Sequence, residues 1–153
     1  MQEADLLELR AFIRGHRQAT LAVVERDEPF TAMVSYAEEP DISGFLMHLS
    51  NLAPHKRQLL ANPRCSLLIS APDTGAGEVL SLPRVTIQGN AAVIPKNTSD
   101  YELAKSCYLA KLPTSAVMFT LGDFDLFRIV ATGGRYIAGF GRTSPFTAVE
   151  LHK

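Results

Sequence analysis

The sequence predicts a mainly β fold, an antiparallel barrel of about six strands with short helices at its periphery. Segments rich in aliphatic and β-branched residues follow one another, separated by short turn sequences that contain Pro, Gly and Asp. Helical patterns are few, and they do not alternate with the strands as they would in a doubly wound parallel fold. With 153 residues, the chain fits a single domain over residues 1–153.

The composition supports a folded domain and argues against several classes of partner. Hydrophobic residues make up 46% of the chain and charged residues 20%, which is enough to build a core. The 15 Lys and Arg residues face 16 Asp and Glu residues, so no overall basic field favours nucleic acid. No apolar run approaches the roughly 18 residues of a transmembrane helix. We therefore expect a cytoplasmic protein with neither nucleic-acid nor membrane partners.

The first segment, residues 1–17, is expected to be a helix that packs on the barrel. An apolar stripe with helical spacing runs through residues 3–16, and Gly15 is a plausible terminator. The stripe consists of Leu6, Leu9, Phe12 and Ile13. The acidic, amphipathic start of the chain lacks the basic region of a secretory signal.

The strands are predicted from alternation and from the turn residues between them. Residues 18–26 are apolar on both faces, which suits a strand buried on both sides. Further strands are expected at residues 30–36, 45–49, 64–70 and 84–94, the last being the longest. The pair Gly133-Gly134 predicts a hairpin between strands at residues 124–131 and 136–140.

Two more helices and two irregular segments complete the chain. A short basic helix is predicted to end at Asn62-Pro63, because a residue before proline is disfavoured in the helical region. Another helix lies within residues 95–109, where Ser99 and Glu102 have capping-box spacing. A loop is expected at residues 71–82 and a short tail at residues 143–153.

The stretch at residues 48–63, HLSNLAPHKRQLLANP, is electrostatically unusual. Pro54 suits the first turn of a helix, and His55, Lys56 and Arg57 crowd that same turn. An exposed cation near a helix N-terminus costs about 0.3–1 kcal/mol. Free backbone N–H groups together with these cations favour an anion, most plausibly a phosphate. The alternative is a solvated helix whose charges point outward.

No catalytic motif or metal framework is evident. The sequence lacks GxSxG, GxxxxGK[ST] and HExxH patterns, and Cys65 and Cys107 are isolated. No two of the four histidines have metal-ligand spacing. His48 is interpreted as a hydrogen-bonded barrel residue and His55 as a ligand contact. His152 would act only as an axial ligand of a haem.

Three arginines and one phenylalanine near strand ends have two interpretations each. Arg84 opens the long strand, and Arg135 and Arg142 flank the last one. They are either solvated charges or contacts to a phosphate or carboxylate. Phe140, between two glycines, packs under a turn or forms a flat wall beside a planar ring.

Several stretches, in this order, resemble the pyridoxamine 5′-phosphate oxidase-like FMN-binding split-barrel superfamily and within it the haem-utilisation (HugZ-like) branch. They are ATLAVV at 19–24, TAMVSYA at 31–37, GFLMHLSNLAPHKRQLLANPRCSLLIS at 44–70, PRVTIQGNA at 83–91, DFDLFRI at 123–129 and AGFGR at 138–142. The resemblance covers most of the chain, and the stretch at 44–70 is its most specific part. It implies a six-stranded split barrel of Greek-key type that forms a homodimer with FMN at the interface.

The resemblance also implies which residues bind the cofactor. The segment from Ser50 to Arg57 would hold the FMN phosphate, and the first two strands would pass along the isoalloxazine. The implied residues are Thr20, Leu21, Ser35, Tyr36, Ser50, Asn51, His55, Lys56, Arg57, Arg84, Gln88 and Arg142. No substrate-phosphate site typical of the oxidase itself is found.

The predicted function is an FMN-binding oxidoreductase, reduced by NAD(P)H, that acts on an unidentified small molecule. The flavin would supply the chemistry, so no catalytic side chain is assigned. One alternative is a haem-binding or haem-degrading protein on the same barrel. The other is a flavin-binding protein without turnover.

Overall fold

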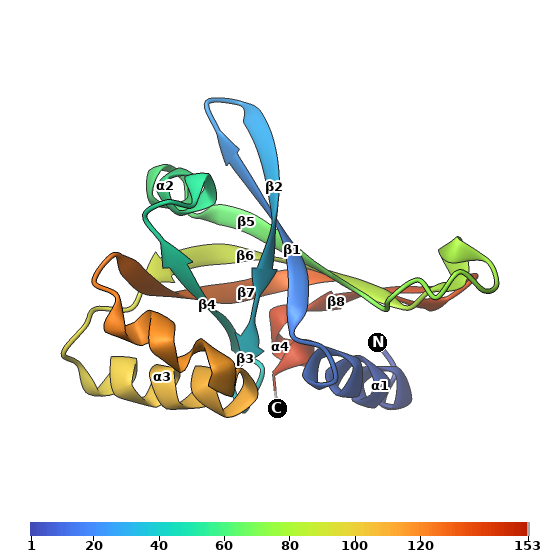
Figure 1. Ribbon diagram of the computed structural model, residues 1–153. Coiled ribbons are helices and arrows are strands. Elements are labelled where there is room, and N and C mark those ends of the chain that lie inside the picture. The colour runs from blue at the N-terminus through green and yellow to red at the C-terminus, as the bar shows by residue number, and fades with distance from the viewer. Residues whose placement is uncertain (153) are drawn as a thin grey trace.

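The computed structural model describes residues 1–152 and has one curled antiparallel sheet at its centre (Figure 1). The strands lie in the order β2-β1-β5-β6-β7-β4-β3, and β8 pairs with β7 outside this path. They are β1 Gln18–Glu25, β2 Glu28–Ser35, β3 Ala37–Glu38, β4 Gly44–Ser50, β5 Arg64–Ser70, β6 Arg84–Val93, β7 Phe124–Gly139 and β8 Arg142–Thr147. The mainly β prediction is confirmed, with an 8-stranded sheet instead of about six strands.

Helices lie around the sheet. They are α1 Glu3–Arg14, α2 Pro54–Ala61, α3 Ser99–Lys111 and α4 Ala148–Leu151, with 3-10 helices η1 Val79–Ser81 and η2 Pro113–Thr120. The predicted N-terminal helix is confirmed as α1, which packs against α4 (Figure 1). Arg10 of α1 ties the two helices together by donating to the carbonyls of Glu150 and Leu151. None of the helices within residues 1–152 is long and apolar enough to cross a membrane.

The core forms because alternate residues of each strand point into the curl of the sheet. In β1, Ala19, Leu21 and Val23 are buried, whereas Gln18 and Thr20 are exposed. The same alternation in β5 and β6 buries Leu67, Ile69, Val85 and Ile87. Each buried side chain of this size stabilises the fold by about 1.5–3 kcal/mol. Consequently, the opposite face of these strands is free to carry polar groups.

The prediction for the last two strands was wrong. Residues 124–131 and 136–140 belong to one 16-residue strand, β7, which is the longest in the sheet. Gly133 and Gly134 are not a turn but lie inside this strand, between β6 and β8. A Cβ on Gly134 would lie only 2.1 Å from the Thr86 carbonyl oxygen, so the glycine permits close strand contact. The real hairpin joins β7 to β8.

Three smaller expectations also differ from the structure. A tail was expected at residues 143–153, but residues 143–151 contribute most of β8 and all of α4, and residue 153 lies outside the described residues. The loop at residues 71–82 contains η1. The N-cap of α3 is Thr98, whose side chain accepts from the backbone N–H of Tyr101, and not Ser99. The sequence pattern located the helix but placed its cap one residue late.

Candidate functional site

Lys56, in the basic stretch at the start of α2, is bonded to polar groups of the chain itself. The Lys56 side chain is only 5% exposed, and its Nζ lies 2.8 Å from Oδ2 of Asp125. The same Nζ donates to Oδ1 of Asn51 at 2.6 Å and to the carbonyl of Asp123 at 3.1 Å. Ser50 Oγ donates to Oδ2 of Asp123 at 2.7 Å. The structure thus brings the predicted Ser50, Asn51 and Lys56 together as one internally bonded group, which we call the lysine cluster.

The two carboxylates of the lysine cluster were missed by sequence reasoning. Asp123 precedes β7 and Asp125 lies in it, and β7 pairs antiparallel with β4, the strand that leads into α2. This register places Asp125 opposite Leu49. The acidic sequence DFD is visible in the chain, but only the strand pairing places it beside Lys56.

The other two basic residues of the stretch, Arg57 and His55, also contribute little free positive charge. Arg57 is exposed, and its Nη1 lies 3.2 Å from Oε1 of Glu25 at the end of β1. Burial lowers the pKa of His55, which favours its uncharged form near neutral pH. Little uncompensated positive charge is therefore left at the helix start.

His48, on β4 beside this stretch, is packed among aromatic rings. Its imidazole stacks on Phe119 with the ring centroids 3.8 Å apart, and Phe124 lies at 4.9 Å. Nδ1 is buried and has no hydrogen-bond partner among the described residues. Burial, with a smaller effect of the Lys96 charge, lowers the pKa of His48 to about 4. The interpretation of His48 as a barrel residue fits this position, although packing rather than a bond to Nδ1 holds it.

One face of the sheet points away from the core over β1, β5 and β6. Thr20 of β1 lies opposite Leu68 of β5, which lies opposite Thr86 of β6. The adjacent row includes Ser66 and Gln88. We call this surface the outer face, and it consists of Thr20, Ala22, Ser66, Leu68, Thr86 and Gln88. It combines small, polar and apolar side chains on a rigid sheet, which is a suitable floor for a flat ligand.

Four of the predicted cofactor-binding residues belong to the outer face or its edge. Thr20 and Gln88 lie on it directly. Ser35 extends it, because its partner in the β1–β2 register is the exposed Gln18. Arg84, at the start of β6, turns its guanidinium to the carbonyls of Leu80 and Leu82. The lysine cluster supplies none of these positions.

Other predicted residues point elsewhere. Leu21 and Tyr36 are fully buried, and the Tyr36 hydroxyl donates to the carbonyl of Ile13 at 2.6 Å. Arg142 lies at the far end of the β7–β8 hairpin, where it pairs with Asp5 and Glu8 of α1. The structure therefore divides the predicted set among the core, the lysine cluster, the α1 surface and the outer face, with His55 and Arg57 on α2 beside the lysine cluster.

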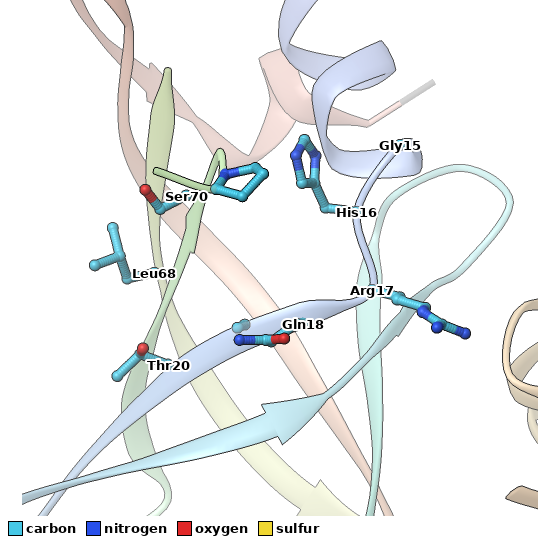
Figure 2. Close-up of a pocket in the computed structure, with 9 residues that line it drawn as sticks. Gly15, His16, Arg17, Gln18, Thr20, Leu68 and Ser70 are labelled. Atoms are coloured by element: carbon cyan, nitrogen blue, oxygen red, sulfur yellow. The ribbon is translucent and has the colours of Figure 1, made fainter. Parts of the chain in front are cut away.

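A cavity of about 330 Å³ lies at the junction between α1 and β1 (Figure 2). Its lining is Gly15, His16, Arg17, Gln18, Ala19, Thr20, Leu68, Ser70 and Pro72. Nδ1 of His16 lies 2.7 Å from the carbonyl oxygen of Phe12, and the two side-chain rings are 4.3 Å apart. The imidazole lies above the strand on the side of Ser70, whereas Arg17 extends away from it (Figure 2). We call this space the His16 cavity; sequence reasoning had given His16 no role.

Two further hollows adjoin the His16 cavity on the same face. One has a volume of about 760 Å³ and includes Ala22, Ser66 and Gln88. The other has a volume of about 520 Å³ and includes Thr86, Gln88 and Arg135. Because Thr20 and Ala22 are successive outward residues of β1, the hollows follow one another along the outer face.

The arginines around these hollows differ from the cations of the basic stretch. Arg17 lines the His16 cavity, Arg64 the 760 Å³ hollow and Arg135 the 520 Å³ hollow. Among residues 1–152 none of the three has a carboxylate partner, and Arg135 donates to the Thr143 hydroxyl at 3.3 Å. The guanidinium groups of Arg64 and Arg135 are available to an anionic ligand, whereas that of Arg17 extends away from the His16 cavity (Figure 2).

Phe140 and His152, the remaining candidates, lie away from the outer-face hollows. Phe140 is 78% exposed in the β7–β8 turn rather than packed under it. His152 follows α4, and its carbonyl accepts from Arg10 at 3.4 Å. Its Nε2 is buried without a partner in the part of the chain that the structure describes.

Comparison with known proteins gives consistent results. Residues 7–138 match the family described as pyridoxamine 5′-phosphate oxidase. Over 112 residues the chain is 38% identical to the chloroplastic haem oxygenase HOZ of Arabidopsis thaliana, covering 72% of this chain and 32% of that protein. It is 22% identical over 147 residues to haem oxygenase HutZ of Vibrio cholerae, covering 94% of this chain and 82% of HutZ.

The fold is also shared with a solved structure, that of a haem binding protein from Mycobacterium smegmatis. The TM-score is 0.87 at 22% identity, over 99% of this chain and 61% of that one. The present chain thus spans about a third of the plant relative and less than two thirds of the mycobacterial one. At this identity the structural likeness establishes the fold alone.

Proposed function

The chain belongs to the pyridoxamine 5′-phosphate oxidase family, in its haem-utilisation branch, and we propose that it binds haem on the outer face of its sheet. Two curated relatives of this chain are named haem oxygenases. Haem is a flat, largely apolar ring with two carboxylates and an iron that accepts a nitrogen ligand. The outer face and its rim supply a group for each of these features.

The observation that carries the proposal is the distribution of unpaired cations. Lys56 and Arg57 are already bonded to carboxylates, whereas Arg64 and Arg135, at the two larger hollows of the outer face, have no carboxylate partner among the described residues. A ligand anion gains most from cations that no internal carboxylate has neutralised. The rim of the outer face therefore suits the two propionates better than the start of α2 does.

The floor of the face fits the ring. Leu68 is 39% exposed and Met33, opposite Thr20 in the β1–β2 register, is 72% exposed. Apolar groups left open beside polar ones are typical of a ligand site or an interface. The His16 cavity adds an imidazole. When bound, haem would supply a redox-active iron, while these side chains bind the ring, orient it and exclude water.

FMN is the second candidate, favoured by the polar residues Thr20, Ser35 and Gln88 on the same surface. The phosphate site implied for FMN at the lysine cluster is less favourable. A phosphate there would approach the carboxylates of Asp123 and Asp125, which already hold Ser50 and Lys56. Flavin binding and reduction by NAD(P)H therefore remain predictions, and the arrangement of charges favours haem binding over them.

We also infer a homodimer that covers the outer face. The exposed Met33 and Leu68 would be removed from water by a second copy, at about 25 cal/mol per Å² of apolar surface. A ligand on that face would then touch both chains. Sedimentation at micromolar concentration tests this inference, and a monomer that binds no ligand would contradict it.

The experiment for the proposed function is a pair of titrations with haem and with FMN. We expect stoichiometric haem uptake with a Soret band and no comparable flavin binding. Leu68→Glu should weaken haem binding at least about tenfold, because it places a carboxylate against the ring and its propionates. The control is Leu103→Glu on α3, which introduces the same charge at a leucine that is 73% exposed and lies away from the outer face. Tight FMN binding without haem uptake would overturn the proposal.

Turnover is tested on the haem-loaded protein. With a chemical reductant and oxygen, a haem-degrading protein loses its Soret band and releases iron. A protein that binds haem without degrading it keeps both the Soret band and the iron. The first outcome would give this chain the activity for which the two curated relatives are named.

A further inference from the structure

We propose that His16 is the protein ligand of the haem iron, an inference that rests on the proposed haem binding. The tautomer, the rigidity and the surroundings of this one imidazole suit it to that role. None of these was visible in the sequence, where His16 is an isolated histidine after a helix terminator.

The hydrogen bond of His16 fixes its tautomer. Nδ1 lies 2.7 Å from the carbonyl oxygen of Phe12. A carbonyl oxygen can only accept, so Nδ1 carries a proton and, in the neutral form of the ring, Nε2 carries the lone pair. Metal-ligating histidines generally donate their other ring N–H to a carbonyl or carboxylate in this way. The neutral imidazole is thus prepared to coordinate through Nε2.

The end of α1 provides that carbonyl. In a continuing helix the backbone N–H of His16 would donate to Phe12, but here it donates to Ile13 at 3.4 Å. The Phe12 carbonyl is left for the imidazole. It also stands at the negative end of the helix dipole, which favours a proton on Nδ1 and makes Nε2 a stronger donor to a metal.

The His16 imidazole is also held in place by a contact with an aromatic ring. Phe12 packs against the His16 imidazole at 4.3 Å, and the Phe12 ring in turn lies 5.9 Å from Tyr136. Phe12 packs against the main core. A ligand fixed by both a hydrogen bond and a ring contact loses little conformational freedom when it binds a metal.

Nε2 of His16 is left available for iron. No hydrogen bond or ion pair engages it among residues 1–152, and it is not a fully buried atom. The ring lines the His16 cavity together with the apolar Leu68 (Figure 2). Pro72 also lines this cavity. An imidazole with a free ring nitrogen beside apolar walls is the combination of groups that a haem edge and its iron require.

The other histidines are less suited to this role. His48 is sealed between Phe119 and Phe124. His55 is on α2, beside the lysine cluster. His152 has a buried Nε2 and lines none of the outer-face hollows. His16 alone among these four lines a cavity of the outer face.

A purely structural role for His16, as a cap of the Phe12 carbonyl, makes a different prediction. The test therefore compares His16→Ala with His16→Gln, since a glutamine amide can still donate to that carbonyl. If His16 binds iron, both variants lose the wild-type Soret position and the electron paramagnetic resonance signature of an imidazole-bound ferric haem. Haem affinity falls at least about tenfold, and free imidazole restores the spectrum of His16→Ala.

His152→Ala and His55→Ala serve as controls and should keep the wild-type spectrum. A wild-type spectrum in His16→Gln, with only a loss of thermal stability in His16→Ala, would reduce His16 to a helix cap. That result would leave haem binding itself intact. A wild-type protein that takes up no haem would overturn both proposals, so the two failures are distinguishable.

Discussion

The lysine cluster and the His16 cavity both contain polar groups, but they differ in how many of those groups have a partner within the protein. In the lysine cluster Lys56 is almost fully buried and has three oxygen partners within 3.1 Å. In the His16 cavity the imidazole has one hydrogen-bond partner, at Nδ1, and its Nε2 has none in the described chain. The polar groups of the first region are therefore paired with one another, whereas the second region keeps an unpaired ring nitrogen.

This difference shows that a basic motif is not by itself an anion site. The cluster of cations in HKR is the more conspicuous sequence signal, but its charge is cancelled by residues distant in the chain. A histidine after a glycine is an inconspicuous signal, but its surroundings leave one ring nitrogen free. Groups that the fold does not satisfy are the better guide to ligand binding.

The strongest test of the contrast is Lys56→Ala. Removing Lys56 leaves the partly buried Asp125 without its close partner, and we expect a loss of about 2–4 kcal/mol in the free energy of unfolding. The control is Lys96→Ala, whose 3.8 Å contact with Asp125 is exposed and should contribute less than about 0.5 kcal/mol. Urea denaturation measures both. A stable Lys56→Ala protein with weakened FMN binding would instead favour the phosphate site.

The next effect concerns the pH dependence of His48. Burial holds the pKa of folded His48 near 4, whereas the group ordinarily titrates at 6.5. Between these values the unfolded chain binds more protons, so the stabilising contribution is complete above pH 6.5 and declines as pH falls toward 4. We expect a loss of about 2–3 kcal/mol over this range. His48→Gln, which cannot titrate, should show a shallower decline in urea denaturation between pH 7.5 and about 4.5.

A smaller effect separates core residues from those of the outer face. Tyr36→Phe removes the hydroxyl that donates to the Ile13 carbonyl and should cost about 1–2 kcal/mol of stability. It should leave haem affinity unchanged, because the ring stays in the core. Thr20→Val is the counterpart, and it should alter ligand affinity with little change in stability. Weaker ligand binding in a fully folded Tyr36→Phe protein would restore Tyr36 to the site.

The elements of the fold were predictable where one periodicity dominated. The apolar stripe of α1 and the alternation in β5 and β6 placed these elements within a few residues of their observed bounds. β7 was divided in two because Gly133-Gly134 has the same sequence signature whether it makes a turn or admits a close neighbour strand. Only the contact with β6 and β8 decides between them.

The candidate site was less predictable, for three physical reasons. In β1 both faces are apolar, so alternation could not show that Leu21 points inward and Thr20 outward. The partner of Lys56, Asp125, depends on the β4–β7 register, which local sequence does not encode. The role proposed for His16 depends on where α1 stops, since one more turn would have engaged the Phe12 carbonyl.

The smallest expected effect is that of Arg57→Ala, which tests whether the basic stretch contributes to ligand binding. Arg57 is 69% exposed and its pair with Glu25 is open to solvent, so the change should cost less than about 0.5 kcal/mol of stability. Because Glu25 already neutralises Arg57, FMN and haem affinities should also stay within about twofold of wild type. Titration of both ligands against Arg57→Ala and Arg64→Ala provides the check. Arg64 has no carboxylate partner in the described chain, and its loss should weaken haem binding more than the loss of Arg57 does. The reverse order would mean that the basic stretch, and not the outer face, receives the anionic groups of the ligand.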